Sequence, residues 1–272
     1  MLTITALLEN KSVNPALNHY SGLSLLLEDD ECQAKILFDT GKDLTFISNA
    51  KKMGIDLTTL KTIVVSHGHY DHFGGLTHLQ ANFFTHKPRI IAHPHLFSVR
   101  YSAFFLGNKN IKFKRLAPLF DRAKLEAQFS FELTQAPLAI EENFIYSGQV
   151  TQRQVNKRYG VIIHGSGEED DFVLDDSFLV WQGKKGLVII TGCSHSGIES
   201  IVEHAKKITG NHQIQAIVGG LHLRCATPSA LQRAKKAIDK NIDVYGCHCT
   251  GVLGRKYLNA KDFNTGQSLS FE

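Results

Sequence analysis

The spacing of apolar residues changes repeatedly along this chain and divides it into short strands and helices. Nearly continuous or alternating apolar runs predict strands at about 2–8, 20–28, 34–38, 62–65, 89–92, 159–164, 171–174, 177–182, 186–191, 214–218 and 242–246, with a short strand at the end. Apolar residues three and four positions apart predict helices at about 43–53, after Gly75, from 197 to 208, from Pro228 to 239 and at 251–259. This order predicts an α/β fold, an αβ/βα four-layer sandwich in which two packed mixed β-sheets are flanked by helices.

No internal repeat and no low-complexity linker divides the 272 residues, so we expect a single domain over 1–272. Residues 94–158 are the least regular part and are rich in aromatic residues, with basic residues between them. Two hypotheses fit this segment: a helical insertion whose aromatic rings pack on the sandwich, or a lid over an active site that presents aromatic faces to a ring-bearing substrate. The same surface would also suit dimerisation.

One loop carries a high concentration of metal-binding side chains. His67, His69, Asp71 and His72 follow the apolar run 62–65 and form the pattern H-x-H-x-D-H, ahead of glycines that we expect to open a helix. Imidazole and carboxylate groups are ligands of zinc, iron and manganese, and loops at the ends of buried strands often carry the chemistry of α/β proteins. The two-residue spacing lets His67 and His69 bind one ion, while Asp71 and His72 reach a second. Two metal ions about 3.5–4 Å apart activate a water molecule in many hydrolases.

Four segments of the chain resemble the metallo-β-lactamase superfamily and, within it, the dihydropterin-ribofuranosyl-aminobenzene-phosphate synthase-like subgroup. These segments are Phe38–Asp43, Val65–Leu76, Thr191–Ile198 and Cys247–Gly251. The resemblance extends over most of the chain and implies a metallo-β-lactamase-like sandwich with a dinuclear metal centre. It also implies that His195 is the third ligand of the first metal and that His248 binds the second.

The sequence departs from the superfamily pattern at one ligand. Many members place an aspartate that bridges both metals at a strand end, where this chain has Ile217–His222 without an acidic residue. His222 is the natural substitute near the metals, and because imidazole bridges two cations poorly, we expect a wider or unequally filled pair of sites. A centre without that carboxylate is more positive, which favours an anionic substrate. Cys249, beside His248, is either a packed thiol or a soft alternative ligand.

Two further side chains are candidates for supporting roles. Asp39 matches an aspartate of the family near the metal loop, where a carboxylate orients a ligand imidazole; the alternative is a turn residue that caps the following helix. His93 ends the strand at 89–92 and would hydrogen-bond substrate or approach a metal, unless it is a satisfied core or surface histidine.

Composition and charge bear on the cellular compartment and on the partners that we expect for this protein. The chain is 43% hydrophobic and 21% charged. No apolar run approaches the roughly 18 residues that span a bilayer, so we expect no membrane segment. An N-terminus without a signal-peptide pattern and an odd number of cysteines suggest a reducing cytoplasm. The net charge of +4 includes basic clusters at 109–115 and 153–158, which are solvated faces or contacts to a phosphate-bearing substrate. This charge is modest for a nucleic-acid-binding protein, and the sequence indicates no oligomeric state.

These features predict a dinuclear metal-dependent hydrolase in which a metal-bound hydroxide attacks a small anionic substrate. We expect two divalent ions, zinc first with iron or manganese as alternatives, and Asp71 as the catalytic residue that orients the hydroxide. The favoured substrate is a phosphoester, related to a pterin or ribosyl-arene phosphate, and a lactone or thioester comes next. A nuclease of the same fold and a non-catalytic ligand-binding sensor are the alternatives from other classes.

Overall fold

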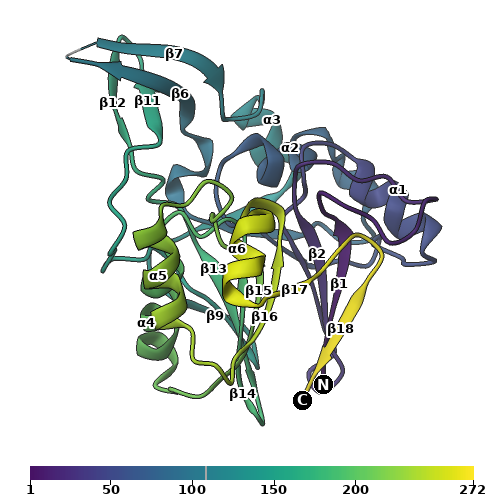
Figure 1. The fold of residues 1–272 in the computed structure, drawn as a ribbon. Helices are drawn as coiled ribbons and strands as arrows, with labels where there is room; N and C mark the ends of the chain where they lie inside the picture. The colour runs from purple at the N-terminus through teal and green to yellow at the C-terminus, as the bar shows by residue number, and fades with distance from the viewer. Residues whose placement is uncertain (108) are drawn as a thin grey trace.

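The computed structural model describes residues 1–107 and 109–272, and three β-sheets organise this part of the chain (Figure 1). The first sheet has the strand order β18 (Ser268–Phe271), β1 (Leu2–Leu8), β2 (Ser24–Asp29), β3 (Ala34–Phe38), β4 (Thr62–Val64), β5 (Arg89–Ala92) and β8 (Ser130–Leu133). The second sheet has the order β17 (Lys261–Asp262), β16 (Asp243–Cys247), β15 (Ile214–Gly220), β14 (Gly186–Thr191), β13 (Phe178–Gly183), β10 (Phe144–Tyr146) and β9 (Leu138–Glu141). A smaller sheet, which we call the arm, contains β12 (Gly167–Asp171), β11 (Gly160–His164), β6 (Val99–Leu106) and β7 (Lys109–Arg115).

Helices cover the outer faces of the two large sheets, and the arm projects from one end of the body (Figure 1). The α-helices are α1 (Thr45–Lys52), α2 (Tyr70–His78), α3 (Arg122–Gln128), α4 (Ile198–Thr209), α5 (Pro228–Ala237) and α6 (Gly251–Leu258). Short 3-10 helices are η1 (Ala81–Phe83), η2 (Pro94–Phe97) and η3 (His248–Thr250).

The core has three parts because each large sheet is buried on both faces. Successive residues of a strand point to opposite sides, so Val64 packs between the two sheets while Ile63 packs with residues of α1 and α2. In the second sheet, Val188 likewise faces the first sheet and Ile189 packs with residues of α4 and α5. Helix, sheet, sheet and helix therefore form four layers, which confirms the predicted αβ/βα sandwich.

The glycines of the metal loop play a different part from the predicted one. We expected them to open a helix, but α2 begins at Tyr70 and contains them. A Cβ atom on Gly74 would lie 2.5 Å from the carbonyl oxygen of Lys42, and one on Gly75 would lie 2.1 Å from that of Thr40. The two glycines therefore let α2 pack directly on the loop after β3. This close packing fixes the start of the helix, where Asp71 and His72 lie.

Two predicted strands are shifted, and the aromatic-rich segment 94–158 contains mainly strands instead of the helices of our first hypothesis. The strand predicted at 20–28 begins at Ser24, and the one predicted at 171–174 ends at Asp171. Within 94–158, strands enter all three sheets, and α3 is the one α-helix of more than a single turn in the described part of this segment.

No helix in the described ranges combines the length and the apolar character that crossing a lipid bilayer would take.

Candidate metal centre

The candidate ligands lie in loops that follow parallel strands at one edge of the sandwich. β4 leads into His67, β14 into His195 and β16 into His248. β3, β4 and β5 run parallel in the first sheet, as do β14, β15 and β16 in the second. The carboxyl ends of parallel neighbours lie at the same edge of a sheet, so the two packed sheets bring these distant loops together.

His67, His69 and His195 form the first group of ligands, which we call the first triad. One ring nitrogen of each lies within 4.8 Å of the others. His69 Nε2 and both ring nitrogens of His195 are buried and have no hydrogen-bond partner among the described residues. Buried polar groups in native proteins are nearly always paired. Three converging imidazoles, two of them with unpaired nitrogens, therefore fit a divalent metal ion.

Asp71, His72 and His248 form the second triad. His72 Nε2 lies 3.2 Å from His248 Nε2, and Asp71 Oδ2 lies 3.7 Å from the same His248 atom. Asp71 and His72 are neighbours in the first turn of α2, where the positive end of the helix dipole favours a carboxylate. One carboxylate and two imidazoles are a ligand set that suits zinc, iron or manganese.

Asp39 connects the two triads through hydrogen bonds. Its Oδ2 accepts from His72 Nδ1 at 2.6 Å and from Ser66 Oγ at 2.8 Å, and its Oδ1 accepts from Ser66 N at 2.7 Å. Ser66 Oγ in turn lies 2.9 Å from Nδ1 of His67. Because His72 and His67 both use Nδ1 in this chain of contacts, their Nε2 atoms are left for a metal. Asp39 thus contacts the candidate ligand His72 directly and reaches the candidate ligand His67 through Ser66, an arrangement that suits the predicted orienting role.

Glu9 and Asn10, just after β1, hold His248. Glu9 Oε1 accepts from the backbone N–H of His248 at 2.6 Å, and Asn10 Oδ1 lies 3.1 Å from His248 Nδ1. On the opposite side of the centre, Asp176 Oδ2 accepts from both N and Oγ of Ser196, at 2.8 and 2.7 Å, and so fixes the loop of His195. The sequence pattern gives no sign of these contacts, which join residues 20 positions apart for Asp176 and Ser196 and 238 or 239 apart for His248.

A buried ion pair supports the metal loop from the base of the arm. Arg100, in β6, is fully buried and donates from Nη1 to Asp175 Oδ1 at 2.9 Å. The other oxygen of Asp175 accepts from the backbone N–H of Gly68 at 2.7 Å, between His67 and His69. Arg100 also lies 3.6 Å from a carboxylate oxygen of Asp171, in β12. The arm and the first triad therefore share one electrostatic network.

His222 lies beside the first triad. Its ring centroid is 4.4 Å from that of His195, and it shares a cluster of potential ligands with His195 and Cys193. Among the ligand clusters of the described residues, none places His222 with a member of the second triad. The structure therefore does not bring His222 between the two triads.

His93 lies outside all the ligand clusters found among the described residues. Its Nδ1 accepts from the backbone N–H of His95 at 3.0 Å, and its Nε2 lies 3.2 Å from Gln149 Oε1. Both ring nitrogens thus have protein partners in a buried position, so the structure does not bring His93 to the predicted substrate site.

Several residues at the candidate centre have a strained backbone conformation. Asp39, Ser194, His222 and His248 have φ values between 49° and 60°, in the left-handed region that residues other than glycine rarely adopt. Such conformations cost on the order of 1–3 kcal/mol each and persist where the surroundings enforce them. Their concentration here indicates a site whose geometry is maintained for function.

Burial and nearby charges set the protonation of the two triads. Burial lowers the pKa of His69 to about 3 and holds the pKa values of His67 and His195 well below their ordinary range. Burial would also lower the pKa of His72, but the charge and hydrogen bond of Asp39 outweigh it and raise the pKa to about 9. The first triad is therefore ready to donate lone pairs, whereas His72 must release a proton before Nε2 can act as a ligand.

We expect the metal-free protein to lose stability as the pH falls from about 7 to about 5. Unfolded histidine takes up a proton near pH 6.5, but the buried His67, His69 and His195 resist protonation in the folded state. Each therefore contributes stability that is present above that pH and declines by about 1.4 kcal/mol per pH unit below it. His72, with its raised pKa, stays protonated in the folded state over this range, while its unfolded form gains a proton near pH 6.5, so His72 adds one smaller, opposing change close to pH 7. Denaturant titrations with chelator at several pH values measure the slope.

Two matched variants test this explanation. His195→Gln removes one buried histidine that resists protonation. The free energy of unfolding should therefore depend less steeply on pH, by about 1.4 kcal/mol per pH unit. His78→Gln changes an exposed histidine and should leave the slope as it is. A stability that does not change between pH 7 and pH 5 would contradict the neutral, buried state of the first triad.

Two adjoining cavities open at the metal centre. The smaller has a volume of about 220 Å³, and its wall includes Asp71, His248, Lys114 and Arg224. The larger has a volume of about 430 Å³ and shares Arg224 and Tyr159 with the smaller one. Its lining is mostly apolar and includes the basic side chains of Lys157 and Arg224, together with Arg233, which pairs with Glu199 at 3.1 Å. The centre is thus accessible from a cleft with positive charge along its sides.

Comparison with known proteins identifies the family. The sequence pattern of the metallo-beta-lactamase superfamily matches residues 18–138, which contain the H-x-H-x-D-H loop. The 7,8-dihydropterin-6-methyl-4-(beta-D-ribofuranosyl)-aminobenzene-5'-phosphate synthase of Methanocaldococcus jannaschii is 31% identical over 247 residues, covering 85% of this chain and 81% of the relative. The chain belongs to the metallo-beta-lactamase superfamily. An uncharacterized protein of the same organism is 30% identical over 233 residues, covering 85% of this chain and 84% of that protein.

Solved structures agree with this assignment. A crystal structure described as a metal-dependent hydrolase of the beta-lactamase superfamily has a TM-score of 0.84 and 26% identity, and the match covers 100% of this chain and 99% of that one. Human tRNase Z, short form, has a TM-score of 0.50 and 14% identity over 98% of both chains, which shows a shared fold. The predicted superfamily resemblance is confirmed. Since one named relative is a hydrolase and another a synthase, family membership by itself does not select the reaction.

Proposed function

We propose that this protein is a dinuclear metal-dependent hydrolase that acts on a phosphoester of a small anionic molecule. The observation that carries the proposal is the pair of triads, whose nitrogens and oxygens converge at the bottom of a cleft lined by basic side chains. The first triad, His67, His69 and His195, would hold one ion. The second, Asp71, His72 and His248, would hold the other, with His222 beside the first. Zinc suits these imidazole and carboxylate groups best, and iron or manganese would also fit.

The two ions, when bound, supply Lewis acidity and lower the pKa of water so that hydroxide is available near neutral pH. The part of the protein in the reaction follows from its own side chains. Although burial would raise the pKa of Asp71, the charges of His72, His248 and His69 outweigh it in the metal-free protein, and bound metal ions would keep the carboxylate ionised in their place. Asp71 can therefore accept a hydrogen bond from the attacking water and orient it. Arg224 and Lys114, in the cleft wall, are placed to bind the anionic groups of the substrate.

The cavities support a substrate with a phosphate at one end and an apolar or ring-shaped group at the other. The smaller cavity joins the triads to Arg224, and the larger continues along apolar residues such as Val155 and Leu223. The named M. jannaschii relative is a synthase of a compound that contains a pterin, an aminobenzene and a ribose phosphate. A pterin- or ribosyl-arene-phosphate-like ester would fill both cavities, whereas hydrolysis of its phosphoester uses the metals more directly than synthesis of a glycosyl bond.

The base of the arm forms one wall of the smaller cavity, and we include it in the proposed site. Ser102, at the centre of β6, and Leu116, just after β7, line the cavity. Lys114 Nζ donates to the hydroxyl of Tyr70 at 2.9 Å, which ties β7 to the start of α2. This part of residues 94–158 would therefore act as a lid or wall over the metals.

The charges of the arm favour a small molecule over a nucleic acid. Lys112 pairs with Glu168 at 2.7 Å, and Arg158 pairs with Asp170 at 2.8 Å. β12 has the sequence Gly-Glu-Glu-Asp-Asp and lies in the same sheet as the lysines of β7. The acidic strand offsets the basic one, so the arm lacks the net positive surface that a phosphate backbone requires.

We expect the purified protein to bind two metal ions per chain, because the structure provides two separate triads. His67→Ala should empty the first position, and His248→Ala should empty the second. Elemental analysis after reconstitution measures the number of ions. His212→Ala, outside the centre, serves as the control and should keep both. Less than half an equivalent of metal in the reconstituted parent would contradict the site.

The reaction is tested by assaying the loaded protein on phosphomonoesters, phosphodiesters, lactones and thioesters. Turnover of phosphoesters that stops on metal removal is the expected result. Preference for lactones or thioesters would move the protein to the second hydrolase class, and steeply salt-dependent binding of RNA or DNA would favour a nuclease. Tight ligand binding that is unaffected by metal removal, with no turnover, would favour a sensor.

A further inference from the structure

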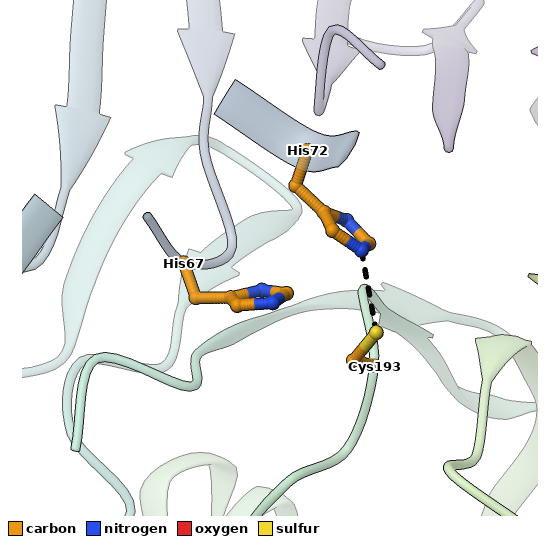
Figure 2. A group of neighbouring side chains, drawn as sticks. All are labelled: His67, His72 and Cys193. Atoms are coloured by element: carbon orange, nitrogen blue, oxygen red, sulfur yellow. Dashed lines mark hydrogen bonds between the residues drawn. The ribbon is translucent and has the colours of Figure 1, made fainter. Parts of the chain in front are cut away.

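Cys193 lies at the meeting point of the two triads. Its Sγ is within 4.8 Å of nitrogens of His67 and His72 in one cluster, and it also belongs to the clusters of His195 with His222 and of His248 with Cys249. No other described side chain enters as many of these clusters. Figure 2 shows the His72 ring pointing toward the sulfur, with Nε2 3.2 Å away, and the His67 ring beside them. The thiol is buried, with 4% of its surface exposed, so this position is not a chance surface contact.

The end of β15, where a bridging aspartate is expected from the superfamily pattern, has no space for a side chain. A Cβ on Gly220 would lie 2.3 Å from the carbonyl oxygen of Gly192 and 2.7 Å from Cys249 Sγ. A Cβ on Gly219 would lie 2.1 Å from the carbonyl oxygen of Thr191. At these two positions the β14 loop occupies the space that a side chain would need. That same loop carries Cys193 into the centre.

We propose that Cys193 binds both metal ions as a thiolate and replaces the missing carboxylate bridge. On metal binding the S–H bond breaks, the proton passes to solvent, and sulfur lone pairs form the metal–sulfur bonds. A thiolate is a strong ligand for zinc and carries the same single negative charge as the carboxylate that it replaces. This inference rests on the two-metal centre of the proposed function, but it does not require that the reaction be hydrolysis.

The test is reconstitution of the metal-free protein with Co²⁺ alone, followed by near-ultraviolet absorption. With two equivalents bound, the parent should show an intense sulfur-to-cobalt charge-transfer band. Cys193→Ser should lose the band. Loss of a residue that only supports a ligand already lowers metal affinity by about 10–100-fold, so this variant should bind the second equivalent weaker by at least that factor. Cys225→Ser, which changes an exposed thiol, should keep both the band and the affinity.

Cys249→Ser separates the two buried thiols near the centre, and it should keep the band. A band that survives in Cys193→Ser, or that disappears only in Cys249→Ser, would overturn the proposal. Zinc-edge X-ray absorption on the loaded parent avoids dependence on the folding of any variant. It should show a sulfur neighbour at about 2.3 Å. Two bound ions with no sulfur neighbour would refute the thiolate bridge while leaving the hydrolase proposal intact. A sulfur neighbour together with no turnover of any ester would support the thiolate bridge and contradict the hydrolase proposal.

Discussion

Asp71→Asn is expected to lower kcat on phosphoester substrates by about 10²–10³-fold, equivalent to about 3–4 kcal/mol of activation free energy. Asparagine keeps nearly the same shape at the start of α2 but lacks the negative charge that, in the proposed mechanism, would hold the second ion and orient the attacking water. The parent's activity should rise with pH through a group with a pKa of roughly 7, the value for zinc-bound water. Steady-state rates across pH, with metal content determined on the same samples, measure both effects.

The control for this variant is Asp30→Asn, which makes the same chemical change at an exposed turn. Both variants should fold as judged by circular dichroism, and the control should keep the parent's kcat. If Asp71→Asn retains more than about half of the parent's activity, the hydroxide-based mechanism fails, since loss of such a group commonly costs on the order of 10²-fold or more. A binding or sensing role would then be the better account of the site.

Arg100→Met is expected to lower the free energy of unfolding by about 3–5 kcal/mol, the usual cost of leaving a buried charge without its partner. The substitution preserves the apolar stem of the side chain but leaves Asp175 and Asp171 as buried carboxylates without their cation. Since Asp175 also accepts from the N–H of Gly68, the metal loop should loosen and bind its ion less tightly. Denaturant titration of the metal-free protein isolates the stability effect from that of the metal.

Arg122→Met provides the comparison, because Arg122 forms an exposed pair with Glu126 one helical turn away. Surface pairs of this kind contribute under about 1 kcal/mol, so this variant should remain close to the parent. Equal effects of the two substitutions would mean that the buried network contributes no more than an ordinary surface ion pair.

The sandwich and the H-x-H-x-D-H loop could be predicted from sequence because the patterns that indicate them are local. Strands such as 34–38 and 89–92 are apolar apart from one basic residue each, Lys35 and Arg89, as expected for strands largely buried on both faces. His67, His69, Asp71 and His72 lie within six residues, so their proximity does not depend on the fold. His195 and His248 required the family pattern, since only tertiary structure brings their strands to the same edge.

Other features depend on contacts that no local pattern contains. Arg100 lies in a stretch of aromatic and basic residues, and nothing there distinguishes it as a buried cation. Cys193 is two residues before the candidate ligand His195, and this spacing could have indicated a further ligand. A lone cysteine at that position is, however, usually a packed thiol. In the arm, Ile111 and Phe113 alternate with lysines as in a strand, whereas the consecutive apolar residues of 103–106 hide the same period in β6.

The hydrogen bonds between His248 and the Glu9–Asn10 turn have a consequence for the order of folding. They join positions separated by more than 230 residues. Contacts of such high sequence separation form slowly, because closing the intervening loop costs entropy before the contact is made. A growing chain completes the first triad once residue 195 has emerged, but it lacks the second until residue 248 follows. In the proposed centre, a second metal ion would therefore bind only after the segment around His248 has folded back onto the segment that follows β1.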